Sequence, residues 1–240
     1  MATPSLLLLL ADGRFPAGAH AHSGGLEAAV AAGRVTDLPT LEAFLAGRLA
    51  TAGLVGAAFA AAAHRAAALA EPCVRSVALT EPAVRSAALA RLDAELDART
   101  AAPALRAVSR RQGRALLRAG RTIWPDAPFA DLPATPGGAH QPLVLGLLCA
   151  TAGLSRVETA TIAAYGTVTG AASAGVRLLG LDPYRVQALL VGLADACDGT
   201  AAEAARAADD PPERLPAAAA PLADIHAEIH ATWEVRLFAS

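Results

Sequence analysis

Aromatic residues and net charge are both scarce in this sequence. Only 4% of its 240 residues are Phe, Trp or Tyr, and the formal net charge is −2. A chain without an excess of positive charge has no overall electrostatic attraction to nucleic acid or to an anionic membrane. We therefore expect neither of these as a partner.

Cysteine is rare as well, since Cys73, Cys149 and Cys197 are the only three. Their number is odd, they lie far apart, and no Cys-x-x-Cys pair occurs. This usage predicts buried, reduced thiols in a cytoplasmic protein.

A targeting segment and a membrane span are not expected either. The Leu-rich start has no basic segment before it, and Asp12 follows it directly, unlike a secretory signal peptide. The longest apolar stretch, residues 53–70, is interrupted by His64 and Arg65. It is shorter than the roughly 20 residues that a membrane-spanning helix needs.

The sequence also lacks the usual motifs of self-contained catalysis. There is no Gly-x-x-x-x-Gly-Lys-Ser/Thr phosphate loop, no Gly-x-Ser-x-Gly turn and no Glu-x-x-His pair of a di-metal bundle. We therefore expect a protein that is not an enzyme and that binds no nucleotide by itself.

The residues that are abundant predict helices. Hydrophobic residues make up 54% of the chain and are mostly Ala and Leu, which favour helix over strand. No alternating strand pattern of useful length occurs. We predict one all-α domain over residues 1–240, a bundle of roughly eight to ten helices.

Several helix boundaries follow from local signals. Gly33 is placed to end a helix over residues 25–32, and Asp37 to begin one that continues to about Leu69. A capping box of Ser155 and Glu158 predicts a helix to about Leu179, and Asp182 precedes Pro183 at the next start. The last predicted helix runs through residues 221–238. Other expected helices cover residues 5–12, 104–123 and 143–154.

Two further patterns have open interpretations. Gly166, Gly170 and Gly175 predict close helix packing, either within the fold or between subunits. A duplication at residues 71–79 and 81–89 is expected to have no function of its own.

A group of arginines lies on one side of the helix predicted at residues 104–123, within an arc of about 140°. It is either a solvated basic face neutralised by the acidic residues 92–97, or a docking surface for an acidic protein. Nucleic acid is a weaker third interpretation, since no aromatic residues interleave. The members are Arg106, Arg110, Arg111, Arg114, Arg118 and Arg121.

Histidines are the candidate metal ligands. His226 and His230 are four residues apart on one helix face, and His20 and His22 can share a side of an extended chain. Glu228 lies about 200° from His226, on the far face. A metal-dependent helical hydrolase that uses these four histidines is therefore one hypothesis, and structural or solvated histidines are the other.

The two ends of the chain, read together, resemble the UreF family of urease accessory proteins. The start "LLLADGRFPAGAHAHSGGLEAAVAAGRVTD" has the family's Leu-rich helix, Pro-x-Gly turn, Ser and Gly-Leu-Glu-x-Ala-Val-x-x-Gly pattern. The end "PLADIHAEIHATWEVRLFAS" is similar to the family's ending. The matching residues with candidate partner contacts are Pro16, Gly18, Ser23, Gly25, Glu27, His230, Arg236, Leu237 and Phe238.

The resemblance implies an all-helical, non-enzymatic homodimer. Such a protein binds UreD (also called UreH), recruits the GTPase UreG and docks on apo-urease, so that nickel, the cargo, reaches the urease active site. No cofactor is expected to bind stably. Phe238 could contact a partner or dock on the protein's own core, and Arg236 could serve as an arginine finger or form a structural ion pair. A generic helical scaffold that uses the arginine face is a further alternative.

Overall fold

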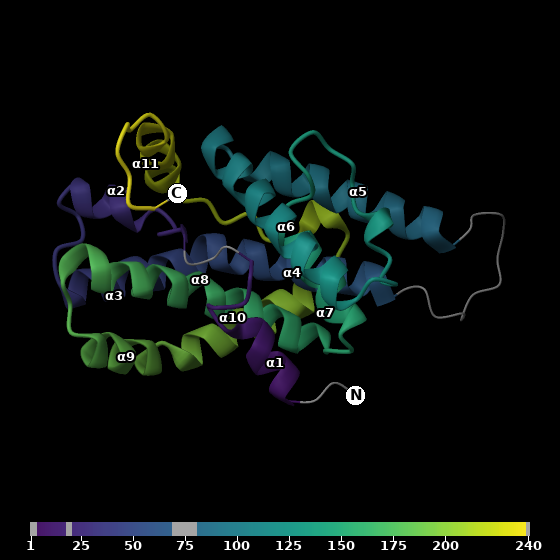
Figure 1. Ribbon diagram of the computed structural model, residues 1–240, viewed down its shortest axis with the longest axis horizontal. Helices are drawn as coiled ribbons and strands as arrows, with labels where there is room; N and C mark the ends of the chain where they lie inside the picture. Colours follow the sequence, from purple (N-terminus) through teal and green to yellow (C-terminus); the bar gives the residue numbers. More distant parts are fainter. Residues whose placement is uncertain (1–3, 18–20, 69–80, 239–240) are drawn as a thin grey trace.

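The computed structural model describes residues 4–17, 21–68 and 81–238, and these residues form helices and no β-strand. The all-α prediction is thereby confirmed (Figure 1). Counting the continuous helix Leu38–Ala68 once, the described part contains ten α-helices, within the predicted range. The elements are α1 (Pro4–Ala11), α2 (Leu26–Ala31), α3 (Leu38–Arg48), the π-helical turn η2 (Leu49–Gly53), α4 (Leu54–Ala68), α5 (Glu81–Arg99), α6 (Pro103–Ile123), η3 (Phe129–Asp131), α7 (Gln141–Thr151), α8 (Arg156–Leu179), α9 (Pro183–Gly192), α10 (Ala194–Ala207), η4 (Pro212–Arg214) and α11 (Pro221–Ala231).

Helix α4 lies at the centre of the bundle. It packs against α7, α8 and α10, and Ala57, Phe59 and Ala63 are fully buried. Together with α3 and η2 it forms one helix, Leu38–Ala68, that by length and composition could cross a membrane. This helix is longer than the apolar stretch of residues 53–70 that was considered from the sequence, because it begins at Leu38. Its packing at the centre accounts for the apolar composition.

The local helix signals are confirmed. Asp37 accepts a hydrogen bond from the Thr40 backbone amide (2.9 Å) at the start of α3. Ser155 and Glu158 form the expected capping box of α8, and Asp182 caps α9 through the Tyr184 amide (2.9 Å). Each cap satisfies amides that have no partner inside the helix.

The final helix was predicted too long. Helix α11 ends at Ala231, and residues 232–238 form an irregular segment that we call the C-terminal tail. The amides of Thr232 and Trp233 bond to the carbonyls three residues before them, which closes the last turn. The tail then turns back towards α2, where its backbone amides find a carboxylate, as described below. Tertiary contacts therefore override its helical pattern.

Glycines allow close contact between some helices and not others. A Cβ at Gly146 of α7 would lie 2.3 Å from the Ala60 carbonyl oxygen of α4, and one at Gly175 of α8 would lie 2.9 Å from Leu41. No described atom lies within 4 Å of a Cβ built at Gly166 or Gly170. Within this chain, close packing is therefore confirmed at Gly175 alone of the three predicted glycines.

The two cysteines that the structure describes, Cys149 and Cys197, are free and buried, as expected. Burial raises the pKa of the Cys149 thiol to about 12. Cys73 and the first copy of the duplicated segment lie outside the described residues.

Candidate functional site

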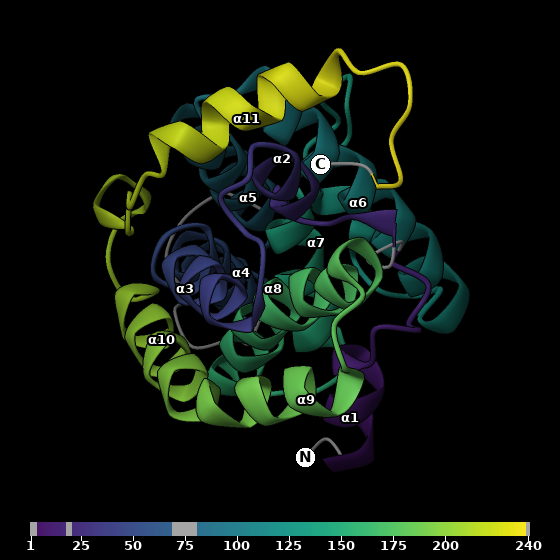
Figure 2. The same ribbon diagram turned by 90° about the vertical axis from the view of Figure 1, so that its left-hand side faces the viewer.

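The N-terminal motif around α2 meets the C-terminal segment of the chain. Figure 1 shows the C-terminus next to this helix, and Figure 2 shows α11 lying across the same end of the molecule, opposite α9 and α10. Helix α2 contacts both α11 and α8. The residues of the two terminal motifs are thus brought together, although they are more than 200 positions apart.

Glu27, in the first turn of α2, holds the C-terminal tail. Its Oε1 accepts a hydrogen bond from the Leu237 amide (2.8 Å), and its Oε2 accepts one from the Phe238 amide (3.0 Å). The same Oε2 lies 3.0 Å from Nε2 of His230. Because a carboxylate only accepts, this ring nitrogen is the donor. One carboxylate therefore fixes both α11 and the tail.

The bonds to Glu27 also set its charge state. Burial on its own would raise the pKa of this carboxyl group, but the bonds from the tail amides and His230 outweigh burial. The pKa of Glu27 consequently lies below its usual value, and the group is ionised at neutral pH. The charge also lies at the N-terminal end of α2, where the helix dipole favours an anion.

The chain before α2 is shaped to place Glu27. Gly24 and Gly25 have φ angles of +63° and +90°, a conformation that other residues adopt with difficulty. Ser23 is fully buried, and its Oγ accepts a bond from the Glu27 amide (3.2 Å). Arg48 of α3 donates to the Gly24 carbonyl (2.6 Å), and burial lowers the pKa of this guanidinium to about 10.

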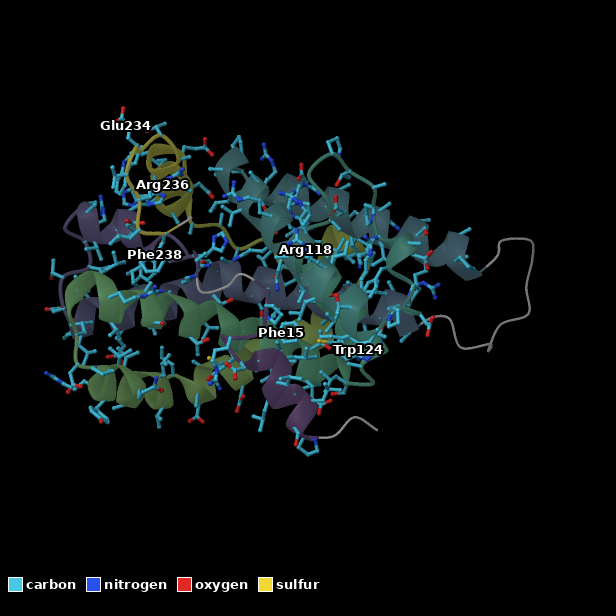
Figure 3. The ribbon with its side chains drawn as sticks, viewed as in Figure 1. Phe15, Arg118, Trp124, Glu234, Arg236 and Phe238 are labelled. Atoms are coloured by element: carbon cyan, nitrogen blue, oxygen red, sulfur yellow. The ribbon has the colours of Figure 1, made fainter. Side chains whose placement is uncertain are left out.

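Aromatic contacts complete the inner side of the junction. Phe238 is only 5% exposed, and the guanidinium of Arg177 from α8 lies 4.3 Å from its ring centre. His230 is fully buried, with its ring centre 4.6 Å from that of Trp233. The docked-on-core interpretation of Phe238 is therefore the one that the structure supports (Figure 3).

The outer side of the junction is apolar and exposed. Leu222, Ile225 and Ile229 of α11 are 44%, 56% and 52% exposed, at positions i, i+3 and i+7 of one helix face. In the tail, Val235 and Leu237 are 85% and 74% exposed. We call these five residues the apolar junction face. Several exposed apolar residues on one helix and the tail that follows it mark an interaction site more often than a single one does.

The predicted site residues fall into three groups. Ser23, Glu27, His230 and Phe238 are buried in contacts within the chain, whereas Pro16, Arg236 and Leu237 are exposed and Gly25 is half-buried. Arg236 forms no ion pair with any described residue, so the expected structural ion pair is not found there. Gly18 and His20 lie outside the described residues.

The histidines do not form a described metal site. His230 donates to Glu27, and His22 and His226 are half-buried. Among residues 4–17, 21–68 and 81–238, no three His, Cys, Asp or Glu side chains are grouped so that they could hold a metal ion. Glu228, predicted on the far face of the helix from His226, accepts a bond from the Ala104 amide (2.7 Å) at the start of α6.

A second polar cluster was missed by sequence reasoning. The fully buried His140 lies 3.0 Å from Asp97 through Nε2 and 3.0 Å from the Ser109 hydroxyl through Nδ1. Arg110 pairs with Asp97 (2.7 Å) and with the buried Asp93 (3.0 Å). The His–Ser–Asp order resembles a catalytic triad. The members of the cluster join α5, α6 and the start of α7, and the Ser109 hydroxyl also accepts a bond from the Gln141 amide (3.3 Å).

Comparisons with known proteins agree with the resemblance of the chain ends. A family model described as UreF matches residues 35–194. The chain is 43% identical over 240 residues to the urease accessory protein UreF of Mycobacterium sp. (strain JLS), with 100% of both chains covered. It is 42% identical over 240 residues to that of Mycolicibacterium vanbaalenii, again with 100% of each covered. Identity to the Mycobacterium tuberculosis (strain ATCC 25177 / H37Ra) protein is 43% over 204 residues, covering 85% of this chain and 86% of that protein.

The fold and these relatives together define the class of protein. It is an all-α urease accessory protein, with a role in urease maturation. Within that class, the chain belongs to the UreF family.

Proposed function

We propose that this chain acts in the cytoplasm as a nickel-insertion chaperone for urease. In this proposal it forms a homodimer, binds a UreD/UreH protein, recruits the GTPase UreG and docks on apo-urease. Nickel is the cargo of the assembled complex, and this chain neither holds a stable cofactor nor catalyses a reaction. Membership of the UreF family supports the proposal.

The apolar junction face is the observation that carries the proposal. Its five side chains remain exposed although the segment beneath them is held firmly by Glu27 and Phe238. Apolar residues on a preorganised backbone lose little conformational freedom when a partner covers them. The exposed Arg236 lies between two of them and adds a side chain that is common at binding hot spots.

The test is complex formation between purified proteins. We expect the chain to co-elute with a UreD-like protein in gel filtration, and the pair to retain a UreG-like GTPase. The double variant Ile225→Asp/Ile229→Asp should weaken the complex by about tenfold or more, because it places two charges in an apolar contact. Val157→Asp in α8 is the matched control, since Val157 is 53% exposed and Ile229 is 52% exposed.

Two results would contradict the proposal. One is the absence of any complex when the partner proteins are competent with another UreF. The other is equal weakening by the control and the α11 variant. A metal-dependent hydrolase, the alternative function, instead predicts stoichiometric metal in the purified protein and no requirement for partners.

A further inference from the structure

The arginines of α6 fall into two groups in the structure. Arg110 and Arg106 face α5, where Arg110 pairs with Asp93 and Asp97, and Arg106 lies 3.8 Å from Asp97. Acidic residues within 92–97 therefore neutralise this part of the arginine group, as the interpretation of a neutralised basic face expected. The remaining arginines are Arg111, Arg114, Arg118 and Arg121, all of them exposed.

These four residues, which we call the outer arginine row, form no ion pair with any described residue. Only Arg114 bonds to another part of the chain, through the Gly137 carbonyl. At 100° and 1.5 Å per residue, the row covers an arc of about 80° and a length of about 15 Å. Figure 3 marks Arg118, in the middle of the row.

The positive charges of the outer arginine row are not neutralised within α6. Helix α6 contains no Asp or Glu, and arginines three or four positions apart repel one another. Carboxylates from outside the chain would relieve this repulsion and could accept bidentate bonds from the guanidinium groups.

We propose that the outer arginine row is a docking surface for an acidic segment of a partner protein. The inference deepens the proposed function and rests on it, because the segment belongs to a protein of the urease maturation complex. Nucleic acid fits the surface less well, since no aromatic residue interleaves with the arginines and the chain carries a net charge of −2.

The direct test uses the full chain and a labelled 14-residue peptide with a Glu at every third or fourth position. The triple variant R111E/R118E/R121E should bind this peptide at least about tenfold more weakly than the unchanged protein. Affinity for the unchanged protein should fall as salt rises.

The matched control is R34E/R185E/R214E, which reverses three exposed arginines elsewhere and should change affinity less than about twofold. The variant R111K/R118K/R121K keeps the charge and should retain intermediate affinity, because lysine cannot form the bidentate bond. If the reversed variant loses its helical circular dichroism, R111Q/R118Q/R121Q replaces it in the comparison.

Equal peptide binding by the α6 variant and the control would overturn the inference, as would tighter binding of poly(U) RNA than of the peptide. Assembly with UreD-like and UreG-like proteins and apo-urease separates the two proposals. If the unchanged protein forms no complex, the proposed function fails. If it assembles and R111E/R118E/R121E assembles equally well, only the docking inference fails.

Discussion

At the residue scale, Glu27 is the side chain that joins the N-terminal motif to α11 and the C-terminal tail. It accepts hydrogen bonds from two tail amides and from the His230 ring, and its side chain is only 10% exposed. A change at this position therefore tests whether the junction is a stable unit.

Glu27→Gln should lower the free energy of unfolding by about 1–3 kcal/mol, because one carboxylate oxygen becomes an NH2 group that cannot accept a bond from a tail amide. Urea denaturation would measure the loss, and hydrogen exchange at the Leu237 and Phe238 amides should become faster. Glu42→Gln on the exposed side of α3 is the control and should stay within about 0.5 kcal/mol of the unchanged protein. Slow exchange at both amides in the Glu27→Gln variant would contradict the assigned role.

Neighbouring arginines of α6 offer a second comparison at this scale. Arg110→Met leaves Asp93 buried, with a 4% exposed side chain, and without its cationic partner. We expect a loss of about 3–5 kcal/mol, because an uncompensated buried charge remains. Arg111→Met, one residue further on, should change stability by less than about 0.5 kcal/mol because Arg111 is exposed. Thermal or urea unfolding of both variants would measure these losses. Similar losses would contradict the division of the α6 arginines into a paired group and the outer arginine row.

At the element scale, α4 and α7 approach each other closely at Gly146. Gly146→Ala would place a methyl group 2.3 Å from the Ala60 carbonyl oxygen, and backbone cannot yield as a flexible side chain can. We expect a loss of about 1–3 kcal/mol, the usual range for an overpacked core.

The control for this prediction is Gly170→Ala in α8, where no described atom lies within 4 Å of the new methyl group. Alanine in a helix interior is favoured over glycine by about 1 kcal/mol, so this variant should be unchanged or more stable. A loss of stability in the Gly170→Ala variant would instead indicate a close contact there, for example with a second subunit.

At the scale of the whole molecule, stability should decrease in acid. Glu27 and Asp97 have pKa values below their usual ones, because bonds to the ionised carboxylates outweigh burial. Such groups contribute stability that is complete above their unfolded pKa values of about 4 and that is lost as pH falls through the lower folded values. Burial also lowers the pKa of His140, so its protonation adds to the loss below about pH 6.5. Burial raises the pKa of Asp224, which acts in the opposite direction.

We therefore expect the urea concentration at the unfolding midpoint to decrease as the pH is lowered from 7 to 3. Its decrease below about pH 4.5 should be smaller in the Glu27→Gln variant, which lacks one of the groups that titrate. A midpoint independent of pH over this range, or the same decrease in both proteins, would contradict the assignment of Glu27.

Family membership was visible at the chain ends, whereas the family model matches residues 35–194, between them. The full-length relatives connect the two observations. The motifs at the ends are recognisable in the sequence because particular positions demand particular residues. Positions 24 and 25 have backbone angles that favour glycine, and position 27 requires a carboxylate to accept the tail amides. What the motifs accomplish, the holding of the tail, left no local signal.

The sequence by itself determined the helices and most of their starts, because caps such as Asp37 and Ser155 act on amides within three residues. Only the tertiary structure decided where α11 ends, which arginines of α6 are neutralised, and that Phe238 lies on the core while Leu237 faces outwards. Each of these depends on contacts between different helices. Glu27 and His230, for example, are 203 positions apart. Helical periodicity describes one element at a time and carries no information about such contacts.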